Sequence, residues 1–146
     1  MIYLDTSYIV KCYVSEPGSD RILAWLEGRR GLVCSCHGRI EFYSALHRHF
    51  QAGRLTAAQV RKVSRQLEAD EDNGIWTWLA VTPALVRHAC TTLAGLDRKT
   101  CLRAADALHL ATSADAGCEE LYSHDRHLLD AASVFGVAAH DILEPS

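Results

Sequence analysis

Short apolar runs alternate with longer helix-like segments along the whole chain, and this alternation constrains the fold more than any other feature. The runs cover residues 2–5, 31–36, 75–81, 120–123 and 137–139. The segments between them have helical periodicity or capping signals and cover residues 6–14, 19–26, 38–51, 56–69, 83–93, 102–116 and 125–133. Strands separated by helices predict a three-layer α/β/α sandwich with a central, mainly parallel sheet of four to five strands.

Local signals support several of these helix ends. Thr56 and Gln59 have the spacing of a capping box, in which each side chain bonds to the other residue's backbone N–H. Thr82-Pro83 is a strong start signal, because proline at the first helical position lacks only an N–H that has no partner there. We therefore expect well-defined helices after both positions.

Length and composition are typical of a globular protein. The chain has 146 residues, 49% hydrophobic and 23% charged, which predicts a single domain over 1–146. No apolar stretch approaches the roughly 20 residues of a membrane span, and the chain does not open with a basic region and an apolar core. We expect no membrane association and a cytoplasmic location.

The cysteines and histidines do not favour a zinc site. The six cysteines form no repeated C-x-x-C pairs, and we expect them to be reduced, semi-buried thiols. The spacing of His47 and His49 turns their rings to different faces of a helix, and His124 and His127 bracket Asp125 in a loop.

Two acidic residues follow predicted strands. Asp5 closes the first apolar run, and Asp125 comes just after the fourth. Open α/β sheets bind ligands beyond the carboxyl ends of their strands, at the point where strand order reverses. If these two strands are neighbours at that point, both carboxylates face one crevice.

Two further acids lie on predicted helices. Asp106 stands in an alanine-rich run, with Leu102 and Leu110 four residues away on either side, where a charge is costly unless something compensates it. A structural carboxylate bonded to a backbone cap or to His109 is the alternative interpretation. Glu41 lies on a helix of mixed polarity, and by itself it indicates only a solvated side chain.

A cluster of these acids requires a cation. Two carboxylates about 4 Å apart repel by roughly 4 kcal/mol at an effective dielectric constant near 20, and a divalent ion removes that cost. Oxygen ligands suit Mg²⁺, with Mn²⁺ as the alternative. The net charge of −3 argues against nucleic-acid binding by bulk electrostatics but not against an acidic, metal-dependent nuclease site. Candidate phosphate contacts are Lys11, Arg39, Arg103 and Arg126, each of which has solvated surface charge as its alternative role.

Four motifs, in order along the chain, resemble the PIN-domain ribonucleases. They are Asp5-Thr6-Ser7, Glu41, Arg103-x-x-Asp106-Ala107-Leu108-His109-Leu110-Ala111, and Ser123-His124-Asp125 ahead of Leu128-Leu129. The resemblance covers essentially the whole chain, and its single-domain size is most similar to the VapC-type toxins of bacterial toxin–antitoxin pairs. Ser123 stands where this family often has threonine.

The resemblance implies an Mg²⁺- or Mn²⁺-dependent endoribonuclease. Asp5 and Asp106 would be the principal metal-binding residues, and Glu41 and Asp125 would ligate the metal or hold its waters. Auxiliary hydroxyl contacts would come from Ser7, Thr6 or Ser123, although capping of the first helix is the alternative role of Ser7.

The same resemblance implies in-line attack of a metal-activated water on an RNA phosphodiester, which leaves a 5′-phosphate and a 3′-hydroxyl. His109 and His124 are near the acids, but we expect such histidines to orient carboxylates rather than to transfer protons. The implied partners are the RNA substrate, a second copy of the chain in a homodimer, and a cognate antitoxin. The motifs do not define the class of RNA.

Three other functions are compatible with parts of the sequence. Asp5 as a phosphate acceptor of the haloacid dehalogenase type would require a second aspartate at position 7, which is Ser7, and receiver domains pair adjacent acids. A PIN-like interaction module without catalysis would not need all four acids. A PIN nuclease of RNA processing, outside toxin–antitoxin systems, has the same motifs.

Overall fold

The computed structural model describes residues 1–144, and within them a five-stranded sheet forms the centre of the molecule. The strands are β1 (Ile2–Leu4), β2 (Leu32–Ser35), β3 (Trp76–Leu79), β4 (Glu120–Tyr122) and β5 (Ala138–His140). Their order is β3-β2-β1-β4-β5, and every neighbouring pair is parallel. The predicted parallel sheet is confirmed.

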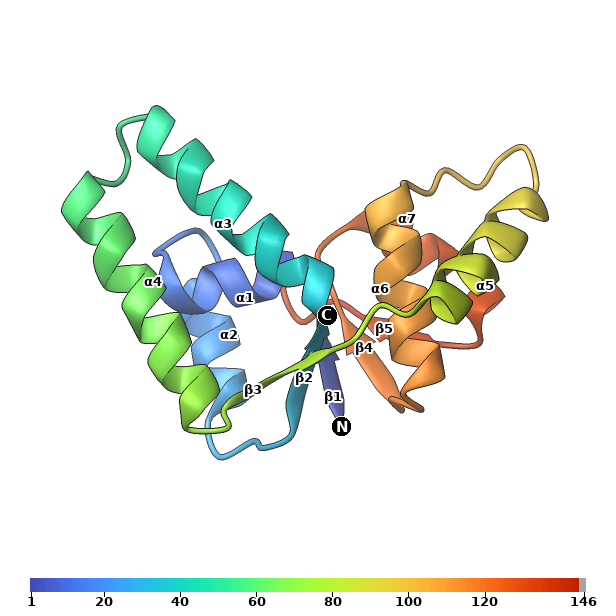
Figure 1. Ribbon diagram of the computed structural model, residues 1–146, viewed down its shortest axis with the longest axis horizontal. Coiled ribbons are helices and arrows are strands. Elements are labelled where there is room, and N and C mark those ends of the chain that lie inside the picture. Colours follow the sequence, from blue (N-terminus) through green and yellow to red (C-terminus); the bar gives the residue numbers. More distant parts are fainter. Residues whose placement is uncertain (145–146) are drawn as a thin grey trace.

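Helices cover the sheet on both sides. They are α1 (Thr6–Tyr13), α2 (Ser19–Leu26), α3 (Cys36–Gln51), α4 (Ala57–Asp72), α5 (Pro83–Ala94), α6 (Ala104–Asp115) and α7 (Arg126–Ala131), the last of which continues into the 3₁₀ turn η1 (Ala132–Phe135). Figure 1 shows α1 to α4 gathered on one side of the strands and α5 to α7 on the other. This arrangement is the predicted α/β/α architecture.

The capping signals act as predicted, and two helices are longer than expected. Thr56 and Gln59 form a complete capping box at the start of α4, and the Thr82 side chain accepts a hydrogen bond from the Leu85 backbone N–H. Helix α4 continues three residues beyond the expected end at 69. Its last turn is held by a hydrogen bond from the Tyr13 hydroxyl to Asp70 and by the ion pair between Arg39 and Glu71.

Helix α3 begins at Cys36, two residues earlier than expected, and its first turn is packed tightly against β2, α1 and α6. A Cβ atom built on Gly38 would lie 2.6 Å from the Cys34 Sγ and 2.9 Å from the Thr6 Oγ1. Contacts this short leave room only for glycine. Gly38 therefore sets how closely the helix that carries Glu41 approaches the sheet.

The cysteines differ in part from the expected semi-buried thiols. All six are free, with Cys34 and Cys118 buried and Cys12 half-buried, whereas Cys36, Cys90 and Cys101 are exposed. Across residues 1–144, every helix is too short or too polar to cross a membrane.

Replacing Gly38 with alanine is expected to destabilise the fold by about 1–3 kcal/mol, because the added methyl group overpacks the junction of α3, β2 and α1. Urea denaturation of Gly38→Ala and wild type measures this change. The matched control is Gly95→Ala, where the nearest atom to a built Cβ is 3.6 Å away, and a change within about 0.5 kcal/mol is expected. Equal stability of the two variants would contradict this account of the packing.

Candidate active site

Strands β1 and β4 are neighbours, and the strand order reverses between them. Strands β2 and β3 lie on one side of β1, and β4 and β5 lie on the other. The parallel pairing continues past the strand ends, because the Asp5 backbone N–H donates to the Tyr122 carbonyl oxygen at 3.0 Å. Asp5 and Asp125 therefore follow the carboxyl ends of adjacent parallel strands. The spatial arrangement expected from the sequence is confirmed.

All four acids singled out in the sequence line one cavity of about 540 Å³. Asp5 comes from the end of β1, Glu41 from α3, Asp106 from α6, and Asp125 from the turn after β4. The lining also includes the following polar side chains: Thr6, Ser7, His37, Ser44, Arg48, Arg103 and His109. Four elements that are distant in sequence thus supply carboxylates to one concave surface.

Asp5 is a buried carboxylate, only 5% exposed, whose direct hydrogen-bond donors are all neutral. Oδ1 accepts from the Ser7 hydroxyl at 2.6 Å and from the Tyr8 backbone N–H at 3.2 Å, and Oδ2 accepts from the Ser123 hydroxyl. Burial raises the pKa of Asp5, although the charge of His109 and these donors oppose the rise. This incompletely compensated anion suits a site for a bound cation.

The auxiliary hydroxyls contact the acids rather than cap helices. Asp5 itself is the N-cap of α1, so the alternative capping role of Ser7 does not hold. Ser7 and Ser123 both bond to Asp5, whereas the Thr6 hydroxyl donates to Glu41 Oε2 at 2.7 Å. These hydroxyls fix the orientation of two of the four carboxylates.

Glu41 is held by a buried histidine. Its Oε2 accepts from His109 Nε2 at 2.8 Å, and His109 Nδ1 lies 2.8 Å from the Tyr3 hydroxyl oxygen. Burial by itself would lower the pKa of His109, but its contacts with Cys34 and Glu41 raise it to about 10. Burial by itself would raise the pKa of Glu41, but the hydrogen bond and charge of His109 lower it to about 2. The pair is therefore an imidazolium and a carboxylate at neutral pH.

His37, Glu41 and His109 bring three potential ligand atoms within 4.8 Å of one another. Both nitrogens of His109 already have partners, however: Glu41 at Nε2 and the Tyr3 hydroxyl at Nδ1. Burial and the nearby charge of His109 lower the pKa of His37 to about 4, and its Nε2 lies 3.1 Å from the Ala105 carbonyl oxygen. We interpret this triplet as support for Glu41 rather than as a metal centre.

Asp106 and Asp125 share one arginine. Arg103 Nε lies 3.0 Å from Asp106 Oδ2, and its Nη2 contacts Asp125 Oδ2. Asp106 is 8% exposed, so it is as poorly solvated as its apolar neighbours predict. Its hydrogen-bond partner is Arg103 rather than the backbone cap or His109 considered from the sequence, and its role as a metal ligand stays a prediction.

The four candidate phosphate contacts are all engaged in ion pairs. Lys11 pairs with Glu16, Arg39 with Glu71, Arg103 with the two aspartates above, and Arg126 with Glu144. Their role in phosphate binding remains a prediction.

His37 and Arg48 also line the acidic cavity, although neither was expected there from the sequence. They lie four residues before and seven residues after Glu41, and that spacing places all three on one face of α3. The guanidinium of Arg48 donates to the Ser44 hydroxyl at 3.0 Å, and its side chain lines the acidic cavity. Helical spacing from Glu41 is the signal that identifies them.

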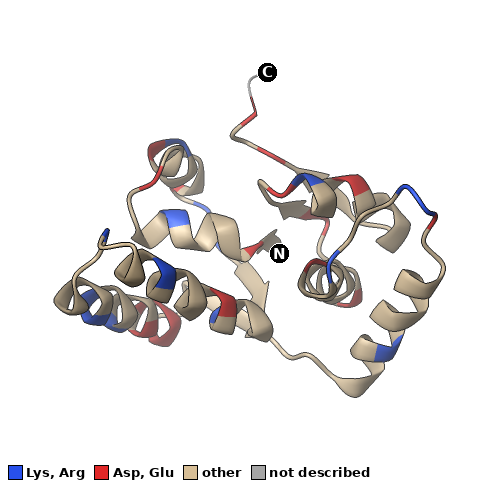
Figure 2. Ribbon diagram, turned by 90° about the horizontal axis from the view of Figure 1, so that it is seen from above, with Lys and Arg blue, Asp and Glu red and all other residues tan. Residues whose placement is uncertain are grey.

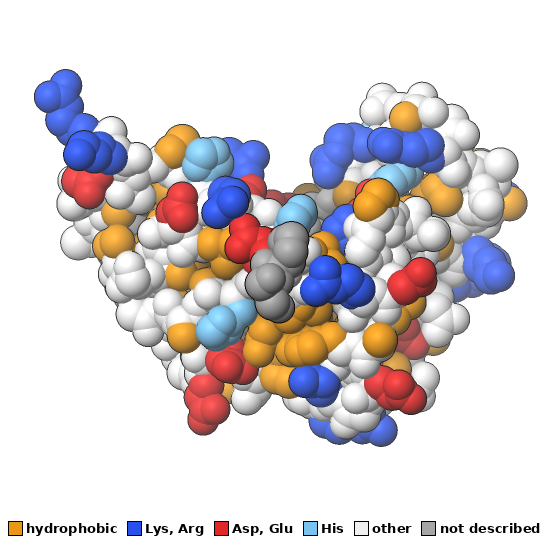
Figure 3. Space-filling view, turned by 180° about the vertical axis from the view of Figure 1, so that it is seen from behind, with side chains coloured by type: hydrophobic (Ala, Val, Ile, Leu, Met, Phe, Trp, Pro, Cys, Tyr) orange, Lys and Arg blue, Asp and Glu red, His pale blue; other side chains and the backbone are white. Residues whose placement is uncertain are grey.

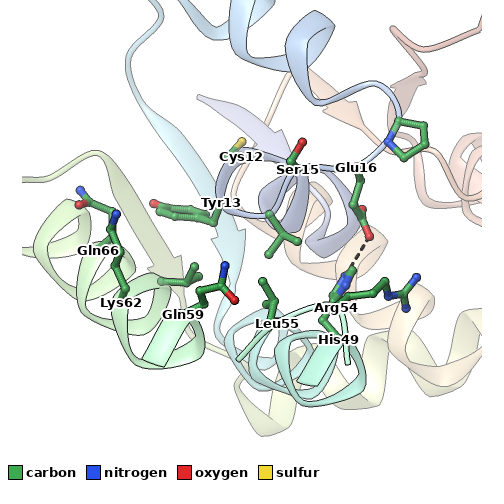
Figure 4. Close-up of a pocket in the computed structure, with 13 residues that line it drawn as sticks. Cys12, Tyr13, Ser15, Glu16, His49, Arg54, Leu55, Gln59, Lys62 and Gln66 are labelled. Carbon is green, nitrogen blue, oxygen red and sulfur yellow. Dashed lines mark ion pairs between the residues drawn. The ribbon is translucent and has the colours of Figure 1, made fainter. Parts of the chain in front are cut away.

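A second cavity, of about 660 Å³, lies between the carboxyl-terminal end of α1 and the junction of α3 with α4. Figure 4 shows its lining side chains and the ion pair between Glu16 and His49, whose Oε1 and Nε2 are 2.9 Å apart. A smaller cavity of about 260 Å³ shares Ser7 and Arg48 with the acidic cavity and shares His49 and Arg54 with the second one. The three cavities form one groove along α1 and α3.

Replacing Glu41 with glutamine is expected to destabilise the metal-free protein most between about pH 4.5 and 6.5. The contribution of His109, whose pKa is raised, is complete below its ordinary value of 6.5 and is lost as the pH rises towards 10. The contribution of Glu41, whose pKa is lowered, is complete above 4.5 and is lost as the pH falls towards 2. Urea denaturation in chelator across this range measures the difference. A difference that does not change with pH, or one matched by the exposed control Glu68→Gln, would contradict the charged pair.

Comparison with known proteins agrees with this geometry. The profile of the PIN domain family matches residues 2–134. Ribonuclease VapC46 of Mycobacterium tuberculosis is 34% identical over 147 residues, which cover 99% of this chain and 98% of that protein. Among solved structures, VapC20 of M. tuberculosis, a toxin that cleaves the sarcin-ricin loop, has a TM-score of 0.69 at 19% identity, covering 90% of this chain and 95% of that one. VapBC2 of Rickettsia felis, bound to a promoter DNA fragment, has a TM-score of 0.67 at 12% identity, covering 97% and 98%. The match to the family profile and the extent of the similarity to VapC46 establish that this chain belongs to the PIN-domain family, as a VapC-type member.

Proposed function

We propose that the protein is a metal-dependent endoribonuclease and the toxin of a VapBC-type toxin–antitoxin pair. The observation that carries this proposal is the convergence of four carboxylates in one cavity, with buried Asp5 bonded only to neutral donors. Membership of the VapC-type branch of the PIN-domain family supports the same activity. In this proposal residues 1–146 act as one PIN-like domain in the cytoplasm.

Asp5, Asp106, Asp125 and Glu41 are the residues that would hold the metal. Their donor atoms are all carboxylate oxygens, which favour Mg²⁺ and also suit Mn²⁺. A divalent ion at this site supplies a water of lowered pKa and stabilises negative charge on a phosphoryl oxygen. The expected products of cleavage carry a 5′-phosphate and a 3′-hydroxyl.

The protein's own contribution is preorganisation. Ser7 and Ser123 fix the Asp5 carboxylate, and Thr6 and His109 fix that of Glu41, so neither group must reorient when substrate arrives. His109 holds its proton at neutral pH and is fully engaged, which argues against its use as a general base. His124 is paired with Asp141 and does not line the cavity.

Basic side chains around the acidic cavity provide contacts for the RNA backbone. Acidic and basic residues are interspersed over both halves of the molecule (Figure 2), and the net charge is only −3. Seen from behind, the molecule is hollowed between its two halves, with Lys and Arg side chains on both walls (Figure 3). Arg48 and Arg103 line the acidic cavity itself, and they join Lys11, Arg39 and Arg126 as candidate phosphate contacts.

An antitoxin and a second copy of the chain are the proposed protein partners. The VapBC-type structural neighbour supports an antitoxin, and the groove that leads from the acidic cavity to the second cavity offers a surface for one of its segments. Ile40, which is 75% exposed at the acidic cavity, is an apolar side chain that a homodimer would cover.

Asp5→Asn is expected to lower metal-dependent RNA cleavage at least about a hundredfold, because it removes a ligand charge while keeping the shape of the side chain. In chelator at pH 7, the Asp5→Asn variant should be at least as stable to unfolding as the wild type. The raised pKa of Asp5 means that its ionised form is disfavoured by folding, and this penalty grows as the pH rises above the ordinary value of 3.8. Gel assays in excess Mg²⁺ and thermal denaturation measure the two effects.

The matched control is Asp130→Asn. Asp130 is an exposed residue of α7 that does not line the cavity, so this variant should cleave RNA at the wild-type rate. If Asp5→Asn cleaves RNA at the wild-type rate, and chelator abolishes cleavage by the variant and by the wild type, the assignment of Asp5 as a metal ligand would be overturned.

Expression of the wild-type protein without its partner is expected to arrest growth, whereas Asp5→Asn should be harmless. Co-expression of a small open reading frame adjacent to the gene should restore growth to cells that express the wild-type protein. A protein that cleaves RNA yet never slows growth would favour the RNA-processing nuclease. One that is harmless and cleaves no RNA with Mg²⁺ or Mn²⁺ would favour the interaction module.

A further inference from the structure

The four carboxylates are held in two different ways. Asp5 and Glu41 are fixed by partners that are themselves buried or half-buried, whereas Asp106 and Asp125 share the side chain of Arg103. That side chain is 66% exposed and belongs to the residue that begins α6, outside the regular helix. A single exposed cation thus offsets part of the negative charge of two of the four carboxylates.

The oxygen atoms of Asp125 have separate partners. Oδ1 accepts from the His127 and Leu128 backbone N–H groups and thereby caps α7. Oδ2 is the oxygen left for the cavity, and it contacts the Arg103 guanidinium. Asp106 Oδ2 is in contact with the same side chain, at Nε. A divalent ion bound by these oxygens would lie beside a guanidinium, and like charges at such short range repel strongly.

We propose that Arg103 is a built-in counter-ion that competes with the divalent metal for Asp106 and Asp125. Metal binding moves the guanidinium off Asp125 Oδ2, and the freed side chain then faces the cavity where RNA phosphates bind. The negative charge of the metal-free cluster is thereby reduced, and metal affinity is lowered until substrate is present. This inference rests on the proposed metal-dependent function.

Arg103→Gln is expected to bind Mn²⁺ about three- to tenfold more tightly than wild type, because the competing cation and its repulsion are both removed. Isothermal titration calorimetry in the absence of RNA measures this affinity. The matched control is Arg126→Gln, which removes another exposed arginine, adjacent to Asp125 in sequence, whose ion pair is with Glu144. Its affinity should stay within about twofold of wild type, since it does not compete for the site.

A purely structural clamp between α6 and α7 predicts the opposite result. If Arg103 only holds Asp106 and Asp125 in place, Arg103→Gln binds Mn²⁺ with equal or weaker affinity and melts at a lower temperature in chelator. Equal affinity or weaker affinity of Arg103→Gln for Mn²⁺ would each overturn the counter-ion role. Tighter Mn²⁺ binding would support it whether or not the variant melts at a lower temperature in chelator, because loss of the counter-ion also leaves the two metal-free carboxylates uncompensated.

Nuclear magnetic resonance provides a readout that does not depend on affinity. The Nε–H signal of Arg103, identified by its absence in Arg103→Gln, should shift when Mg²⁺ is added, whereas that of Arg126 should not. An Arg103 signal that does not shift in protein saturated with metal would overturn the proposed competition between Arg103 and the metal, but not the metal-dependent function. A wild-type protein that binds neither Mg²⁺ nor Mn²⁺ would overturn the proposed metal-dependent function as well.

Discussion

The parallel pairing of β1 with β4 is the interaction on which the rest of the site depends. It aligns Leu4 with Tyr122, so the residues that follow both strands emerge at the same edge of the sheet. The hydroxyl of Ser123 can then reach Asp5, and Asp125 can face the same cavity. Because side chains alternate between faces along a strand, a shift of one residue in this register would separate these groups.

Three kinds of partner balance the clustered negative charge, and each requires a different part of the fold. Asp5 relies on neutral donors from α1 and from the residue after β4, Glu41 relies on a buried imidazolium from α6, and Asp106 and Asp125 rely on Arg103. The second of these depends on Gly38, whose missing side chain lets α3 approach Thr6 and His109. The charge balance of the site therefore depends directly on how closely α3 packs against the rest of the fold.

Sequence patterns predicted those features that depend on local or periodic information. The alternation of strands and helices was sufficient for the parallel sheet, and the positions of Asp5 and Asp125 after strands predicted that they would meet. Asp106 was recognisable from its apolar neighbours, whereas Glu41 required the family resemblance. The ion pair of Arg39 with Glu71 and the charge on His109 depend on residues far apart in sequence that only the folded chain brings together. No local pattern predicts such contacts.

Asp5 and Asp125 are both the N-cap residues of the helices that follow them. In each, Oδ1 accepts backbone N–H groups from the first turn of its helix, which leaves Oδ2 with more lone-pair capacity for a cation. In the proposed metal site, this arrangement favours coordination through the other oxygen of each residue. Much of the shell of a bound ion would then be water, which would favour an ion that gives up its hydration reluctantly over one that seeks many protein oxygens.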